Sequence, residues 1–266
     1  MGLYDRMKES FAYDCYRCWR FGRPVRWRRR EKLLYRSLFG REARQLLIFD
    51  IGAHRGQRTA LFLGLGARVV AVEPDPRNQR ILARRFLGGF RPRPLTLVPK
   101  AVSDTDAGAT LWVHEAGSGL NSLSPKWVET LGADETRFGR RLDFPGRQPV
   151  ETTTLAALME SFGVPDYIKI DVEGHEPSVL RGLKRPVRFV SFEVNLPEFL
   201  PEGIEGVGTL DRLAQPGLFN WYGGWATGLA LPHWLPATAF IAALRECPES
   251  SVEVFWQPGP VLPAGK

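Results

Sequence analysis

The residues best suited to chemistry are Asp171, Glu173 and His175, which alternate with Val172 and Gly174. The strand-like run Tyr167 to Val172 delivers them to its carboxyl end. Charged groups seldom crowd the end of a buried strand without a ligand or metal. The carboxylates could hydrogen-bond a ligand or take up a proton. Neutral imidazole is available near pH 7, so His175 is the expected general base, with capping or packing of a helix start as the alternative.

Oxygen ligands from neighbouring strand ends could instead hold a divalent cation such as Mg²⁺. The strand-like run Phe189 to Val194 contains Glu193 and is followed by Asn195. Together with Asp171 and Glu173, these two residues form the predicted ligand set. Such an ion would orient acceptor oxygens and lower the pKa of an attacking hydroxyl. The sequence supplies suitable ligands but not their distances.

A pattern nearer the N-terminus is typical of a nucleotide-binding βαβ unit. The apolar run Leu46 to Ile51 breaks into a turn that contains Gly52 and Gly56, and after a helical stretch a second run ends at Glu73. Glycines let the backbone approach a ligand, and the acid accepts hydrogen bonds from ribose hydroxyls. We therefore predict an adenosine cofactor.

The same turn indicates which cofactor is bound. A dinucleotide fingerprint needs three glycines, because a pyrophosphate must rest on the helix N-terminus, and only two glycines fit here. Asp50 would repel a pyrophosphate. It suits the ammonium and sulfonium groups of S-adenosylmethionine, so the turn favours this methyl donor.

Strand-like runs alternate with helical patterns along most of the chain, which predicts an α/β fold with a mostly parallel sheet covered on both faces. The expected strands are Leu46 to Ile51, Arg68 to Glu73, Leu95 to Ser103, Tyr167 to Val172 and Phe189 to Val194. The expected helices are Thr59 to Leu65, Arg77 to Phe86, Thr154 to Phe162 and Pro177 to Gly182. The ligand then belongs at the carboxyl ends of the strands.

Two regions depart from this alternation. Residues 105–150 are too long for a simple crossover, and they contain a strand-like run, Thr110 to His114, and a Ser-rich stretch, so we expect an insertion that forms either a lid or disorder. The aromatic C-terminal part, 196–266, predicts antiparallel edge strands at Phe219 to Tyr222 and Val252 to Gln257, with a helix between them.

The positive charge lies ahead of this domain. Residues 1–45 carry 13 Lys and Arg against 5 Asp and Glu, whereas residues 46–266 carry 23 against 24, so we predict a basic, partly helical N-terminal extension before a domain that spans 46–266. Basic residues with interleaved aromatics at 17–36 could lie on an anionic membrane surface or grip a polyanion. The alternative is a helix packed on the domain.

Nothing in the sequence predicts a membrane span or a secretory signal, so a cytoplasmic protein, peripheral at a membrane if the basic extension binds one, is expected. Cys15, Cys18 and Cys247 lack the second pair that a zinc site requires, and are read as reduced thiols.

The ordered motifs resemble those of the FkbM-type methyltransferases. They are Asp50 to Gly56 with Thr59, Val72-Glu73-Pro74, Lys100 to Asp104, Ile168 to Glu176 and Phe192-Glu193-Val194. The resemblance implies a Rossmann-like class I methyltransferase fold with a mostly parallel seven-stranded sheet and a C-terminal antiparallel edge. It also implies transfer of a methyl group to a hydroxyl of a sugar, glycolipid, polysaccharide or natural product. His54 departs from the family, which more often has Asn there, but an imidazole can also donate a hydrogen bond.

The resemblance also implies a role for particular residues. The implied cofactor-binding residues are Asp50, Gly52, Ala53, His54, Gly56, Thr59, Glu73, Pro74, Ala101, Val102, Asp104 and Asp171. Asp171 would close the pocket beside the methyl group, with Glu173 and His175 as the other catalytic residues. For Asp104, a plain turn residue is the alternative.

Two other functions compete with this reading. One is an RNA or protein methyltransferase whose basic extension contacts phosphates or acidic groups. The N/D-P-P-Y/F block of many amino-methylating enzymes is missing, since Asp171-Val172-Glu173-Gly174 stands in its place, and this favours oxygen as the acceptor. The other is a non-catalytic cofactor-binding protein, against which the acids at Asp50, Glu73 and Asp171 argue.

Overall fold

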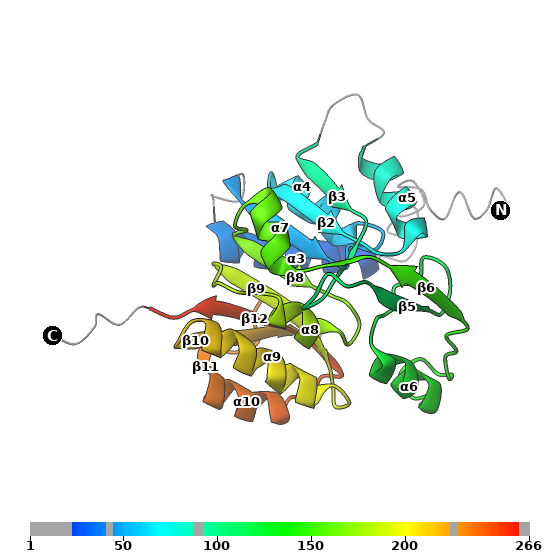
Figure 1. Ribbon diagram of the computed structural model, residues 1–266. Coiled ribbons are helices and arrows are strands. Elements are labelled where there is room, and N and C mark those ends of the chain that lie inside the picture. The colour runs from blue at the N-terminus through cyan, green and yellow to red at the C-terminus, as the bar shows by residue number, and fades with distance from the viewer. Residues whose placement is uncertain (1–22, 41–44, 88–92, 224–227, 261–266) are drawn as a thin grey trace.

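A computed structural model describes residues 23–40, 45–87, 93–223 and 228–260 (Figure 1). Its central sheet has the strand order β11-β10-β12-β9-β8-β1-β2-β3. Five of these strands run parallel: β1 (Leu47–Ile51), β2 (Arg68–Val72), β3 (Leu95–Val98), β8 (Tyr167–Ile170) and β9 (Phe189–Asn195). The α/β class and the mostly parallel sheet are therefore confirmed.

The antiparallel edge lies at the C-terminal part of the chain. Strand β12 (Ser251–Pro258) runs against β9, and β10 (Gly217–Gly223) runs against β12. The sheet has eight strands rather than the expected seven, because the short β11 (Leu235–Pro236) pairs with Leu218 and Phe219 at its edge. The helix α10 (Ala237–Arg245) follows β11, close to where the sequence places it.

Helices cover both faces of the sheet and enclose two apolar layers. One layer contains α3 (Arg23–Phe39), α4 (Gln57–Leu65) and α5 (Pro76–Phe86). The opposite layer contains α7 (Leu155–Phe162), α8 (Glu176–Arg181), α9 (Leu200–Leu213) and α10. Two expected helix starts are capped by side chains, since Thr154 accepts from the Ala157 N–H and Asp75 from the Arg77 N–H.

The predicted strand Leu95 to Ser103 is divided in two. Strand β3 ends at Val98, and β4 (Ala101–Val102) leaves the sheet to pair in parallel with β7 (Thr152–Thr153). Pro99 stands at the break, where it has no N–H to donate to a neighbouring strand. The chain therefore turns at Pro99 and starts a separate small sheet.

The insertion is ordered and lies beside the main sheet. Strands β5 (Ala109–Val113) and β6 (Gly146–Val150) pair antiparallel, and α6 (Pro125–Ala133) packs below them (Figure 1). A small apolar cluster holds this unit together, with Trp127, Leu131, Leu142, Phe144 and Phe199 buried. The expected strand at Thr110 to His114 is confirmed with a one-residue shift, whereas α6 was not expected.

Helix α3 packs on the domain through its described residues. Leu34, Tyr35 and Phe39 are buried, and the Tyr35 ring meets the edge of Phe62 at 5.1 Å between centroids. Glu31 on α3 forms an ion pair with Arg58 on α4 at 2.8 Å. Residues 30–39 thus follow the packed-helix alternative. Residues 17–22 and the side chains of 23–29 lie outside the described residues, so membrane contact there stays a prediction.

Two further expectations concern membrane-spanning helices and the cysteines. In the described ranges, no helix is both long and apolar enough to cross a bilayer. Cys247 is a free thiol, while Cys15 and Cys18 lie outside the described residues.

The Glu31–Arg58 pair predicts how firmly α3 is docked. The Glu31 side chain is only 1% exposed, so Glu31→Ala removes a buried ion-pair partner of Arg58 and should lower the free energy of unfolding by about 3 kcal/mol. Urea unfolding measures this loss. Glu205→Ala is the control, because its pair with Arg181 is half exposed and should contribute under about 1 kcal/mol. If Glu31→Ala lowers the free energy of unfolding no more than Glu205→Ala does, α3 is held by apolar contacts alone.

Candidate active site

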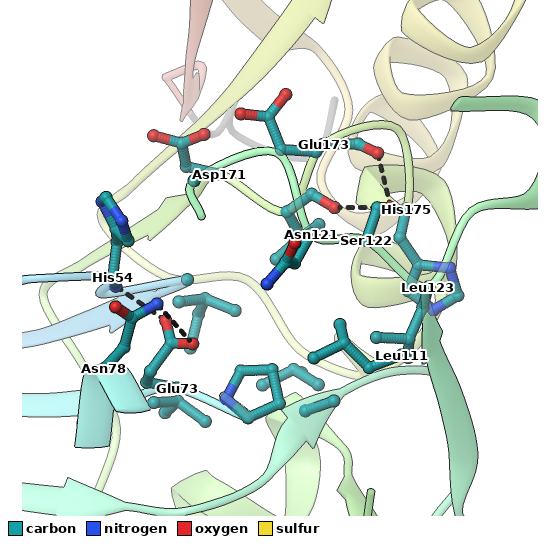
Figure 2. A pocket seen from close by; sticks show the side chains of 18 of the residues that line it. His54, Glu73, Asn78, Leu111, Asn121, Ser122, Leu123, Asp171, Glu173 and His175 are labelled. Atoms are coloured by element: carbon teal, nitrogen blue, oxygen red, sulfur yellow. Dashed lines mark hydrogen bonds between the residues drawn. The ribbon is translucent and has the colours of Figure 1, made fainter. Parts of the chain in front are cut away.

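A cavity of about 560 Å³ opens at the carboxyl ends of β1, β2 and β8 (Figure 2). Seven of the predicted site residues for the cofactor line it: Gly52, His54, Glu73, Pro74, Ala101, Val102 and Asp171. Glu173 and His175 line it as well. The topology therefore brings motifs from four separate stretches of chain to one place.

The turn after β1 is shaped by close approach of two backbones. Gly52 has φ +78°, and a Cβ atom there would lie 1.9 Å from the carbonyl oxygen of Asp171. His54 also has a left-handed backbone, with φ +50°, which is uncommon for a residue other than glycine. The His54 N–H and the N–H of Asp75 both point at the Glu73 carboxylate, at 2.7 and 2.9 Å.

Glu73 is buried beside these donors. Burial raises the pKa of its carboxyl to about 7, although the two backbone N–H groups act in the opposite direction. Glu73 also lines the cavity, and Asn78 Nδ2 lies 3.5 Å from its Oε1. The carboxylate is thus arranged to accept hydrogen bonds from a bound polyol such as a ribose.

Five predicted cofactor residues are not among the described lining residues of the cavity: Asp50, Ala53, Gly56, Thr59 and Asp104. Asp50 is 1% exposed and accepts a hydrogen bond from the Thr59 hydroxyl. A Cβ on Gly56 would lie 2.4 Å from the Phe86 ring, so this glycine admits α5. Asp104 pairs with Arg181 at 3.1 Å near the surface.

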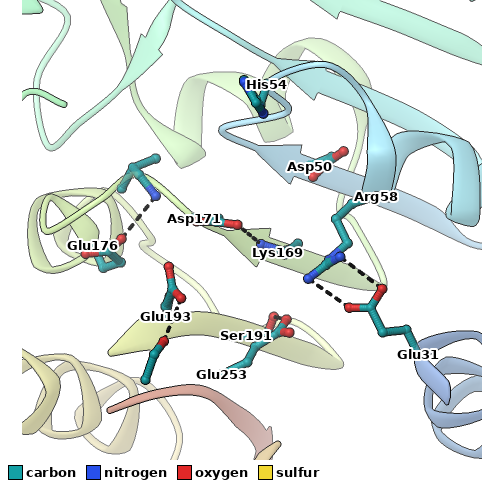
Figure 3. A network of polar contacts seen from close by, with 12 residues as sticks. Glu31, Asp50, His54, Arg58, Lys169, Asp171, Glu176, Ser191, Glu193 and Glu253 are labelled. Atoms are coloured by element: carbon teal, nitrogen blue, oxygen red, sulfur yellow. Dashed lines mark hydrogen bonds and ion pairs between the residues drawn. The ribbon is translucent and has the colours of Figure 1, made fainter. Parts of the chain in front are cut away.

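A carboxyl cluster occupies the ends of β8 and β9. Carboxylate oxygens of Asp171, Glu173 and Glu193 lie within 4.8 Å of one another. Lys169 Nζ, 3% exposed, donates to Asp171 Oδ2 at 2.7 Å (Figure 3). Burial alone would raise the pKa of Asp171, but the charge of Lys169 and its hydrogen bond hold that pKa below its usual value. Asp171 is therefore the ionised member.

The other members of the cluster hold their protons more tightly. Burial, followed by repulsion from Asp171, raises the pKa of Glu193 to about 8, although Ser251 donates to it at 2.7 Å. Burial and the charges of Glu193 and Asp171 raise the pKa of Glu173 well above its ordinary value. Like charges this close cannot all ionise together, so the cluster stores a proton near neutral pH.

His175 lies on a different side of the cavity. Its ring is near Leu123, away from the carboxylates of Asp171 and Glu173 (Figure 2). Its Nε2 is 3.0 Å from the Ser103 hydroxyl, and burial lowers the pKa of the ring to about 4. The imidazole is therefore neutral near pH 7, as expected, but it faces the β4 wall rather than the carboxyl cluster.

Three of the four predicted metal ligands lie together, and the fourth, Asn195, makes another contact. Asn195 Oδ1 accepts from Arg137 Nη1 at 2.7 Å, so this oxygen is turned toward the insertion. The other three candidates, Asp171, Glu173 and Glu193, form the carboxyl cluster. Sequence spacing places Asn195 at the right strand end, but it does not show that Arg137 takes up its oxygen.

The cavity also has a wall that sequence reasoning did not assign. Residues 118–123 of the insertion line it through Ser118, Gly119, Asn121, Ser122 and Leu123. Asp75 Oδ2 accepts from the Gly117 N–H and from Asn121 Nδ2, both at 2.9 Å. The Ser-rich composition of this stretch indicated a loop, but only the folded chain shows where it docks. The lid was expected at Gly132 to Pro149, which is not among the described lining residues.

A doubly covered parallel sheet, a glycine turn, an acid after β2 and an acid after β8 define a methyltransferase that uses S-adenosylmethionine. The family model described as "Methyltransferase FkbM domain" matches residues 50–207, and this chain belongs to that family. A comparison with curated proteins finds no match.

Solved structures of methyltransferases resemble the chain at low identity. A TehB-like S-adenosylmethionine-dependent methyltransferase from Corynebacterium glutamicum and a precorrin-6y C5,15-methyltransferase from Geobacter metallireducens each share 11% identity over 80% of both chains, with a TM-score of 0.40. An O-methyltransferase from Bacillus cereus, in complex with S-adenosylhomocysteine, shares 11% identity over 85% of this chain and 80% of that chain, with a TM-score of 0.38. Likeness at this level says nothing about the acceptor, and it lends no support to a divalent cation.

The approach of Gly52 to Asp171 predicts the effect of one methyl group. Gly52→Ala forces a Cβ onto the Asp171 carbonyl and an alanine into a left-handed backbone, so affinity for S-adenosylhomocysteine should fall at least about 100-fold. Isothermal calorimetry measures it. Gly64→Ala, in open space on α4, is the matched control and should raise stability by about 0.5–1 kcal/mol. Full binding by Gly52→Ala would contradict the close approach.

The raised pKa of Glu193 predicts a dependence of stability on pH. Its pKa is about 8 when folded and 4.5 when unconstrained, so the native state holds the extra proton between these values. The contribution of Glu193 to the free energy of unfolding therefore falls as pH rises from about 5 to 8. In Glu193→Gln, the decrease in the free energy of unfolding over this range should be smaller by on the order of 1–3 kcal/mol. Urea unfolding at several pH values tests this. Glu129→Gln, at an exposed site on α6, should keep the wild-type slope.

Proposed function

We propose that this chain transfers the methyl group of S-adenosylmethionine to a hydroxyl oxygen of a sugar, glycolipid, polysaccharide or natural product. The observation that carries the proposal is the carboxyl cluster at the ends of β8 and β9, in contact with the cofactor cavity through Asp171 and Glu173. A hydroxyl must lose its proton during attack, and this cluster contains groups able to receive it.

The cofactor would lie along the cavity from the β2 side to the β8 side. Glu73 would accept hydrogen bonds from the ribose, and the apolar side chains of Ala101 and Val102 would contact the adenine. The β8 end would then face the sulfonium. Asp171, which the ion pair with Lys169 keeps in its ionised form, would attract the positive charge of the bound donor. In-line placement of donor and acceptor supplies most of the rate in such transfers.

Two residues compete for the role of proton acceptor. His175, the base expected from the sequence, is neutral at pH 7 but has a pKa of about 4, and its Nε2 is engaged with Ser103. Glu193, with a pKa of about 8, becomes available as a base as pH rises through that value, and it lies within 4.8 Å of Glu173, which lines the cavity. We therefore favour Glu193, acting with Glu173, as the acceptor of the hydroxyl proton.

The residues at the end of β8 favour oxygen over nitrogen as the acceptor. A protonated amine and a hydroxyl both need a base. However, the N/D-P-P-Y/F block with which many enzymes hold an amine is replaced here by Asp171 to Gly174. Carboxyl groups side by side instead suit the several hydroxyls of a sugar or polyol.

Cofactor binding and methyl transfer are tested separately. Calorimetry with S-adenosylhomocysteine should show one site per chain, and an absence of heat at any tested concentration would remove the cofactor from the proposal. Labelled S-adenosylmethionine, incubated with a panel of glycosides and polyols, should then yield a labelled methyl ether. Label found only on amines or nucleic acid would overturn the oxygen acceptor.

The pH profile separates the two bases. If Glu193 accepts the proton, the rate should rise as pH climbs through about 8, and Glu193→Gln should lower kcat by about 10²–10⁴. If His175 is the base, the rate should level off above about pH 4, and His175→Ala should cause the larger loss. Initial rates of methyl ether formation from pH 5 to 10 distinguish these outcomes.

A further inference from the structure

The backbone that carries Glu173 has an uncommon conformation. Glu173 has φ +56° and the next residue, Gly174, has φ +89°. A left-handed residue other than glycine persists only where its surroundings hold it, and such positions cluster at functional sites. The question is therefore which contacts fix this turn.

The contact nearest to Glu173 comes from the insertion. The Ser122 hydroxyl donates to the Glu173 carbonyl oxygen at 2.7 Å and lies 3.3 Å from that of Val172. The same hydroxyl accepts from the Ser124 N–H at 2.9 Å. Ser122 is only 1% exposed, so the loss of these buried hydrogen bonds would be costly.

Ser122 is itself held firmly from the other side. Its N–H and carbonyl pair with Trp112 on β5, at 3.2 and 2.8 Å. The loop then continues back to Gly117, whose carbonyl accepts from His54 Nε2 at 3.1 Å and whose N–H donates to Asp75. One short loop thus touches the cofactor turn at one end and the Glu173 turn at the other.

We propose that Ser122 is a positioning residue, which fixes the Glu173 turn so that the Glu173 carboxylate faces the transferred methyl group. The inference rests on the proposed function, because that function places the methyl donor in the cavity. It extends that function by making the insertion part of the active site, where it links the cofactor wall to the carboxyl cluster.

A pair of ligands tests this without knowledge of the acceptor. Sinefungin carries an amine where S-adenosylmethionine carries its methyl group, whereas S-adenosylhomocysteine has nothing there. The ammonium of sinefungin favours the ionised form of a neighbouring carboxyl, so a well-placed Glu173 should give up its proton on binding and make sinefungin the tighter ligand, through a charge-assisted hydrogen bond. The ratio of the two dissociation constants reports the Glu173 position, and the S-adenosylhomocysteine value alone reports the rest of the cavity.

Ser122→Ala should reduce the sinefungin preference about 5- to 10-fold, while S-adenosylhomocysteine affinity changes less than about threefold. Ser122→Thr keeps the hydroxyl and should restore the preference. Ser122→Cys, a weaker donor, should fall between them and serves if the alanine variant does not fold. Ser124→Ala is the matched control, since it removes a buried hydroxyl that caps α6 but donates nothing to Glu173.

Other results would overturn the inference. An unchanged preference in Ser122→Ala, an equal loss in Ser124→Ala, or parallel loss of both ligands would show that Ser122 only stabilises the insertion. Failure of the wild-type protein to bind either ligand would instead remove the proposed function, and the inference with it.

Discussion

The ion pair between Lys169 and Asp171 is the interaction on which the site depends. Acidic side chains gather at the ends of β8 and β9, and desolvation penalises every one that ionises there. One buried ammonium at 2.7 Å compensates one carboxylate only. Asp171 can stay charged, and its neighbours share protons instead. The site therefore combines a fixed anion with titratable groups a few ångströms away, and the proposed transfer from a cationic donor to a hydroxyl requires both.

The same pair ties the site to the body of the domain. Lys169 lies on the face of β8 that also carries Tyr167, which packs in the layer formed with α3 and α4. Tyr167 and Ser191 both contact Glu253 on β12, and Arg58 joins Glu31 nearby. Polar groups buried this extensively are tolerated because each finds a partner. Helix α3 completes that layer, so residues that read as an extension in the sequence contribute to the environment of the catalytic strand.

Much of the fold and about half of the site could be predicted from the sequence. Apolar runs located the five parallel strands, and the glycine turn and Glu73 marked the cofactor side, because these patterns are local along the chain. Long-range partners were beyond such reasoning. Nothing near Asn195 in the sequence shows that Arg137 binds its oxygen, and nothing near Asp50 shows that this acid is covered by Thr59 rather than open to the cavity. The wall at 118–123 depends on Asp75, more than forty residues earlier in the chain.

The small sheet formed by β4 and β7 holds the two ends of the insertion side by side. Ala101 pairs with Thr152 and Val102 with Thr153, so the chain departs just after two residues that line the cavity and returns directly beside them. A segment whose two ends are clamped together can change in length or shape while the floor of the cavity keeps its geometry. Relatives could therefore exchange this excursion for another and acquire a different acceptor, without rebuilding the part that holds the methyl donor.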